Sequence, residues 1–218
     1  MKNIVIINSI IDTPNLPLSY TKTRSVFSTQ QRFQQTQYTI QTIKKYIPDP
    51  YIIIVECSYF NEEQYNFFNN NCDHIINLFN DEESKNFIYS NSKSSGEGTM
   101  TIKALEYILT ANIEYNCFFK ISGRYFLNEH FNIHNFINQY NVIKQTDHLS
   151  INTTFYKINK KYIETLLKFL KNSYDKMKKC ISYEIIFKLF IDTINDNKYI
   201  NNLGCSGNVA ICGTLINA

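Results

Sequence analysis

FFKISGRYFL, residues Phe118–Leu127, is an apolar strand that becomes polar where it ends, at Lys120, Ser122, Gly123 and Arg124. In open α/β sheets, ligands bind outside the carboxyl ends of the strands. A guanidinium such as that of Arg124 is a fixed fork of donors that suits phosphate, and a glycine lets a ligand approach the backbone closely. The stretch therefore predicts one edge of a binding site. A core strand that ends in a surface turn, with Arg124 solvated, is the alternative.

Three earlier apolar runs are typical of strands buried on both faces of a parallel sheet: Ile4–Ile7, Tyr51–Val55 and Ile75–Phe79. Helical patterns separate them, over about 29–46 after a Ser28–Gln31 capping box, from Asn61, and over about 99–110. This alternation predicts an α/β protein with a mostly parallel sheet, flanked by helices and joined by right-handed crossovers.

The second part of the chain has a different pattern. Leu149–Phe155 alternates like a half-buried strand, Ile163–Leu170 is an amphipathic helix, and Ser182 opens another helix. Two short extended pieces follow, over about 199–203 and 208–212. No repeat or linker divides the sequence, so we expect a single domain over 1–218, with halves of about 1–127 and 128–218.

Composition limits the function. The chain has 218 residues, of which 44% are hydrophobic and 19% charged, a balance typical of a globular protein. A net charge of +3 is too small for a protein that binds nucleic acid through its overall positive charge. The six cysteines are scattered, which indicates reduced thiols and a cytoplasmic location. The N-terminus reads as a first strand rather than a signal peptide, and no apolar run is long enough to span a bilayer.

Several charged residues stand where a site could form. Arg24 lies in a long first crossover loop, and loops of that length usually have a function. Glu56 ends the second strand, either as a ligand group for a ribose or base edge or as an ion-paired structural residue. The acidic run Asn80–Glu83 favours a helix cap over a metal site. The glycines of Lys93–Gly98 could let a helix N-terminus meet an anion, although neither phosphate-binding fingerprint is present.

Together these motifs resemble small single-domain glycosyltransferases of the GT-A type. Among these are enzymes of large DNA viruses, including the first domain of a capsid-glycosylating rhamnosyltransferase. The resemblance spans nearly the whole chain and is carried by Thr23–Phe27, Ile52–Glu56, Gly96–Gly98, Phe119–Tyr125 and the closing glycine-rich strand. It implies transfer of a sugar from a nucleotide diphosphate donor, UDP-sugar in the first instance, to a glycan or glycoprotein. The first half would bind the nucleotide sugar and the second half the acceptor, in the host cytoplasm if the protein is viral.

The resemblance also implies roles for individual residues. Asn8 and Ser9 would lie near the base, Arg24 near the base or diphosphate, and Glu56 near the nucleoside, with Gly96 also on the donor side. Lys120 and Arg124 fall where such enzymes usually have an Asp-x-Asp metal site, and Gly123 would lie beside them on the donor side. Ser122-Gly123-Arg124 offers no carboxylate pair. Either cations replace the Mn²⁺ or Mg²⁺ ion, or Asp81 or another acid holds it.

Catalysis needs a positive field on the departing diphosphate and, for inversion, a base for the acceptor hydroxyl. Lys120 and Arg124 suit the first task. Glu184, in the first turn of a helix, is the candidate base, and Asp147 is the reserve. Simple complementation of the helix dipole is the alternative role for Glu184. The competing functions are a nucleotidyltransferase and a non-catalytic nucleotide-sugar-binding module.

Overall fold

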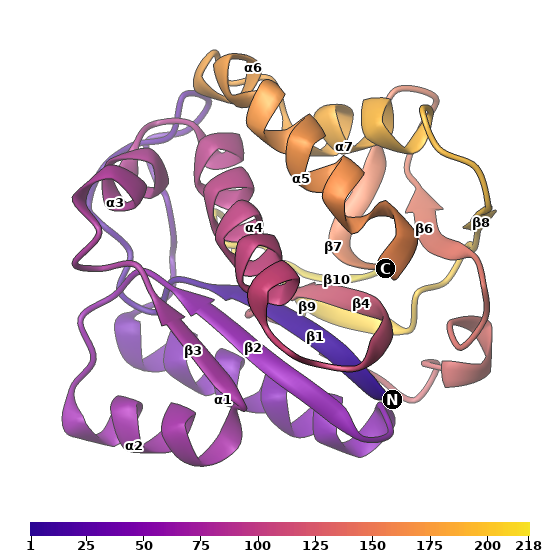
Figure 1. The fold of residues 1–218 in the computed structure, drawn as a ribbon. Coiled ribbons are helices and arrows are strands. Elements are labelled where there is room, and N and C mark those ends of the chain that lie inside the picture. Colours follow the sequence, from indigo (N-terminus) through magenta and orange to yellow (C-terminus); the bar gives the residue numbers. More distant parts are fainter.

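The computed structural model describes residues 1–218 (Figure 1). The strands are β1 Lys2–Ser9, β2 Pro50–Glu56, β3 His74–Asn77, β4 Tyr115–Ser122, β5 Tyr125–Leu127, β6 Asn141–Gln145, β7 Ile151–Asn159, β8 Asn197–Tyr199, β9 Cys205–Asn208 and β10 Leu215–Asn217. The α-helices are α1 Thr29–Tyr46, α2 Glu62–Asn71, α3 Glu82–Tyr89, α4 Lys93–Thr110, α5 Ile163–Asn172, α6 Tyr174–Lys178 and α7 Tyr183–Ile191. Two 3-10 turns cover Ile133–Asn135 and Lys160–Tyr162.

Seven strands form one sheet in the order β3-β2-β1-β4-β7-β6-β8. The first four are parallel to one another, which confirms the predicted α/β class. Strand β7 then pairs with β4 in the antiparallel direction, so one sheet runs through both halves of the chain. The register sets Ser9 beside Glu56 and Asn8 beside Ser122. The polar ends of β1, β2 and β4 therefore meet at one edge of the sheet.

Helices cover both faces of this sheet, with α1 and α2 on one side and α4, α5 and α7 on the other (Figure 1). Alternate residues of β1 enter the two cores: Ile4 and Ile6 pack on the α4 side, and Val5 and Ile7 on the α1 side. All four are fully buried. Burial of β-branched side chains on both faces is the physical reason that the continuous apolar runs form central strands.

A second sheet, in the order β10-β9-β5, continues directly from the stretch that ends β4. Three threonines on one face of α1 bind this segment. Thr36 donates to the Gly123 carbonyl at 3.0 Å, Thr39 donates to the Tyr125 carbonyl at 2.7 Å, and Thr42 accepts from the Leu127 amide at 3.1 Å. These bonds set the direction in which the chain leaves the main sheet.

The first predicted helix has the expected start, because Ser28 and Gln31 form the capping box. The prediction that a helix begins near residue 99 was wrong, since α4 begins at Lys93 after the N-cap Ser92. Gly96 and Gly98 lie inside its first turns. A Cβ at Gly96 would meet the Ile88 carbonyl at 3.2 Å, and one at Gly98 would meet the Met177 sulfur at 2.2 Å. Close packing with neighbouring elements thus accounts for these glycines.

None of the helices has the length and apolar character needed to cross a membrane. All six cysteines are free thiols.

Candidate active site

A cavity opens at the edge of the sheet where β1 and β4 end. Its other walls come from the crossover loop of residues 12–27, the first turn of α4, the first turn of α7, and residues 209–211. Six residues that the sequence singles out line it: Asn8, Ser9, Arg24, Gly96, Arg124 and Glu184. Residues from both halves of the chain thus share one cavity, while their roles stay predictions.

The end of β1 gives the cavity a polar wall. Asn8 is buried and donates through Nδ2 to the Thr101 hydroxyl at 3.0 Å, while its Oδ1 has no hydrogen-bond partner. The Ser9 hydroxyl is 2.9 Å from that of Thr36. An unpaired buried acceptor costs free energy unless water or a ligand satisfies it. Asn8 is therefore a candidate for direct ligand contact.

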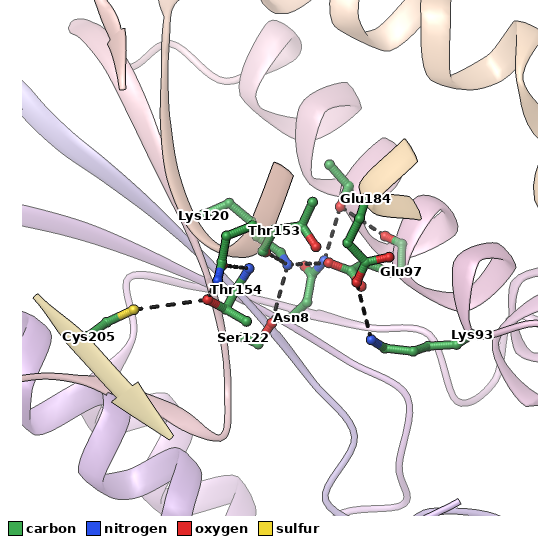
Figure 2. A network of polar contacts seen from close by, with 11 residues as sticks. Asn8, Lys93, Glu97, Lys120, Ser122, Thr153, Thr154, Glu184 and Cys205 are labelled. Atoms are coloured by element: carbon green, nitrogen blue, oxygen red, sulfur yellow. Dashed lines mark hydrogen bonds and ion pairs between the residues drawn. The ribbon is translucent and has the colours of Figure 1, made fainter. Parts of the chain in front are cut away.

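Lys120 lies beneath the cavity in a buried ion pair with Glu97 of α4 (Figure 2). Its Nζ is 2.5 Å from Glu97 Oε1 and also donates to the Thr153 carbonyl at 2.8 Å. Burial alone would raise the pKa of Glu97, but the ammonium groups of Lys120 and Lys93 more than offset this and lower it. Glu97 is therefore an ionised carboxylate whose charge is matched by the lysine that was predicted to bind the donor.

Glu184 and Lys93 face each other at the mouth of the cavity, with 3.5 Å between Oε1 and Nζ (Figure 2). Glu184 follows the N-cap Ser182 in the first turn of α7, and its side chain is one-third exposed. Loss of hydration lowers the pKa of Lys93, but the carboxylates of Glu184 and Glu97 raise it by more. A carboxylate that is reachable from solvent and borders the cavity has the geometry of a proton acceptor.

Two guanidiniums, those of Arg32 and Arg124, also line the cavity. Arg32 is 4% exposed and donates through Nε to the Ile10 carbonyl at 2.5 Å. Burial, with the nearby charge of Arg124, lowers the pKa of Arg32 to about 9, so it stays charged at neutral pH. Burial also lowers the pKa of Arg124. The cavity wall therefore carries positive charge from α1 and from the end of β4.

Arg24 has a different environment. Its guanidinium donates to the carbonyls of Leu16, Ile88, Tyr89 and Ser90. The last three are at the C-terminal end of α3, where orphan carbonyls favour a cation. The side chain thus attaches the crossover loop to α3, and each of its three nitrogens already donates to a carbonyl.

Four predicted residues do not line the cavity: Glu56, Lys120, Gly123 and Asp147. Glu56 is fully buried, and its Oε1 accepts from the Ile11 and Cys57 amides and the Ser58 hydroxyl. These bonds hold the loop after β1. At Gly123, a Cβ would lie 2.8 Å from that of Ser9, so the neighbouring space is filled by protein.

Asp147 belongs to a turn between β6 and β7, where its carboxylate accepts from the Leu149 and Ser150 amides at 2.7 and 2.9 Å. Bonds from Ser150 and Leu149 lower its pKa. It borders a separate surface hollow, which Glu184 borders too. Asp147 is thus close to the base candidate but outside the main cavity.

No role was predicted for Arg32, Lys93 or Glu97, all of which line the cavity. One signal pointed to Arg32, because it shares the inward face of α1 with Thr36, Ile40 and Ile43, and a charged residue on a buried face needs a reason. No local signal identifies Glu97, since its partner Lys120 is on another element.

The side chains at the cavity do not fit a divalent metal. No group of three His, Cys, Asp or Glu residues is arranged to hold one. The only carboxylates on the cavity wall are Glu97 and Glu184, and each faces a lysine. Asp81, the alternative metal ligand suggested by the sequence, is the N-cap of α3 and lies outside the cavity. It forms an ion pair with Lys103 at 2.9 Å.

The sheet order, the flanking helices and the cavity at the strand ends define a GT-A-like fold, and the solved structures that resemble the chain include glycosyltransferases. The glycosyltransferase GlyE of Streptococcus pneumoniae TIGR4 aligns with a TM-score of 0.52 and 10% identity, over 92% of this chain and 45% of that one. The chain therefore spans about half the length of GlyE. The galactosyltransferase LgtC, in complex with donor and acceptor sugar analogs, aligns with a TM-score of 0.55 and 9% identity, over 90% and 72%.

A CTP:phosphocholine cytidylyltransferase from Streptococcus pneumoniae, LicC, aligns with a TM-score of 0.51 and 12% identity, over 94% of this chain and 92% of that one. A glycosyltransferase involved in glycosylation of the major capsid of PBCV-1 reaches a TM-score of 0.46 and 12% identity, over 91% and 80%. By sequence, no protein family and no curated protein matches the chain. At these identities the structural likeness shows the fold alone.

Proposed function

We propose that the chain is a glycosyltransferase that moves a sugar from a nucleotide diphosphate-sugar to a hydroxyl of a glycan or glycoprotein. The observation that supports this is one cavity, at the strand ends of a GT-A-like fold, that combines unpaired guanidiniums with a partly exposed carboxylate. Such a cavity can neutralise a departing diphosphate on one side and accept a proton on the other.

The proposed reaction joins the acceptor oxygen to the anomeric carbon while the bond from that carbon to the phosphate oxygen breaks. The electron pair of the broken bond goes to the nucleoside diphosphate, beside Arg124. In an inverting reaction, Glu184 takes the proton of the acceptor hydroxyl. Asn8 and Ser9, at the end of β1, are the proposed contacts of the nucleoside, and Asp147 is the reserve base.

A nucleotidyltransferase is the second candidate, because LicC shares the fold. That reaction normally uses a carboxylate pair to hold metal, and the two cavity carboxylates here face Lys120 and Lys93 instead. A binding module without turnover is the third. If Glu184 moves no proton, the cavity fits a binding module as well as it fits an enzyme.

Calorimetry with a panel of nucleotide sugars, with and without Mn²⁺, would separate these functions. UDP-sugars are the first donors to test, followed by GDP-, CDP- and dTDP-sugars. Hydrolysis of one nucleotide sugar, or transfer of its sugar to an acceptor, supports the glycosyltransferase. Release of pyrophosphate from a nucleoside triphosphate and a sugar phosphate would favour the nucleotidyltransferase. Binding without any turnover would leave the binding module.

A further inference from the structure

The chain uses arginine only at the cavity. It contains 19 lysines but three arginines, Arg24, Arg32 and Arg124, and all three line this one cavity. Lysine carries nearly all other positive charge. Arginine differs from lysine in presenting a rigid, planar fork of donors that matches the oxygens of a phosphate. Arginine thus replaces lysine at the cavity, where a bidentate contact with an anion would be useful.

None of the three guanidiniums forms an ion pair with a carboxylate. Every ion pair of the structure has a lysine or His130 as its cation. Buried charges in proteins are normally paired, because the loss of hydration is costly. Arg32 is almost completely buried and forms no ion pair, although the more distant charge of Glu56 offsets part of the effect of burial on its pKa. The cavity therefore has uncompensated positive charge.

The hydrogen bonds show which donors are free. Arg24 uses Nε and both terminal nitrogens on backbone carbonyls. Arg32 uses Nε on Ile10 and Nη1 on the Ser25 hydroxyl, and no protein atom accepts from its Nη2. Arg124 uses only Nε, on the Asn208 carbonyl at 3.3 Å, so both of its Nη atoms are free. The two arginines with free donors line the same cavity, and the charge of Arg124 lowers the pKa of Arg32.

We propose that the free guanidinium nitrogens of Arg32 and Arg124 bind the diphosphate of the donor and that this contact takes the place of a divalent metal. The inference rests on the proposed function and makes it more specific. A doubly charged diphosphate would relieve the repulsion between the two arginines. The carboxylates that could hold a metal are Glu97 and Glu184, and each already faces a lysine.

The test is titration calorimetry of UDP, GDP, CDP and dTDP against the full chain, first in EDTA and then in Mn²⁺. We expect one nucleoside diphosphate to bind with the same affinity in both buffers. Arg124→Gln should weaken that binding about 10- to 100-fold, the usual effect of losing charged hydrogen bonds. The affinity for the matching nucleoside, which has no phosphate, should stay within about twofold.

Two further variants complete the design. Arg32→Lys keeps the charge but loses the fork, and we expect weaker diphosphate binding. Lys161→Gln removes one positive charge at an exposed ion pair with Asp196, outside the cavity, and should bind as the wild type does. If Arg32→Lys unfolds at lower temperature, Arg124→Gln alone decides the test.

The outcomes are distinguishable. Diphosphate binding that requires Mn²⁺ would overturn the inference and leave the proposed function standing. Metal-independent binding that Arg124→Gln does not weaken would overturn the assignment of residues. If no nucleoside diphosphate bound in either buffer, the proposed function itself would fail.

Discussion

Glu97 of α4 and Lys120 of β4 form an ion pair of 2.5 Å in which the lysine is fully buried. Lys120 also donates to the Thr153 carbonyl of β7. The pair therefore joins the helix that opens the cavity to two strands of the sheet that form its floor.

Removing one partner of this pair should destabilise the protein strongly. We expect Glu97→Gln to lower the free energy of unfolding by about 3–5 kcal/mol, because Lys120 would be left as a buried, unpaired charge. The double variant Glu97→Gln with Lys120→Met should lose less than the sum of the two single variants. Urea denaturation of all four proteins measures this coupling. Strictly additive losses would show that the two side chains stabilise the fold independently.

Glu184→Gln should separate proton transfer from donor binding. The amide keeps the shape of the side chain but cannot accept the proton, so we expect turnover to fall about 100- to 10,000-fold. Nucleoside diphosphate affinity should remain close to that of the wild type. Single-turnover transfer assays beside calorimetry provide both values. Full activity in this variant would remove Glu184 as the base and direct attention to Asp147.

Asp81→Ala distinguishes a helix cap from a metal ligand. Asp81 accepts from the Ser84 amide at 3.1 Å, and this bond, followed by Lys103, lowers its pKa to about 2. Loss of the cap should cost about 1 kcal/mol at pH 7. Because the pKa is depressed, the stability from the ionised carboxylate is present above pH 3.8 and is lost as the pH falls toward 2.

The difference between wild type and Asp81→Ala should therefore shrink in acid, as measured by thermal unfolding across that range. Nucleotide binding in Mn²⁺ should not change. A large loss of Mn²⁺-dependent binding would instead identify Asp81 as a metal ligand.

Glu56→Gln tests the buried carboxyl at the end of β2. Burial raises the pKa of Glu56 above its ordinary 4.5, so the native state holds this proton more tightly than the unfolded chain does. The resulting stability is complete below pH 4.5 and is lost as the pH rises through the higher native pKa. Glutamine can keep the bonds of Oε1 and does not titrate. The denaturation midpoint of Glu56→Gln, measured relative to that of the wild type, should therefore be higher at pH 8 than at pH 5. An equal difference between the two proteins at both pH values would contradict this account.

Much of the fold could be predicted from local patterns. The apolar runs of β1, β2 and β4 and the capping box at Ser28 each depend on neighbouring residues, and the structure contains all of them. The resemblance placed Asn8 and Arg124 at one site, and both line the cavity because the parallel strands β1 and β4 end at a common edge.

The charge pairing could not be predicted in this way. Lys120 was expected to face the ligand, but it does not line the cavity, and its ammonium group instead bonds to Glu97 of α4, 23 residues earlier in the chain. The structural reasons for Gly123 and Gly98 could not be predicted either. Their neighbours Ser9 and Met177 come from distant segments, and only the packed structure brings them together.

Residues 209–211 form one wall of the cavity, and the Ala210 carbonyl accepts a hydrogen bond from Val26 in the crossover loop at 2.8 Å. During synthesis, the residues of β1, α1 and β2 leave the ribosome long before residues 209–211 do. If the cavity binds nucleotide as proposed, the nucleotide would stabilise the folded chain only after this last wall has closed the cavity.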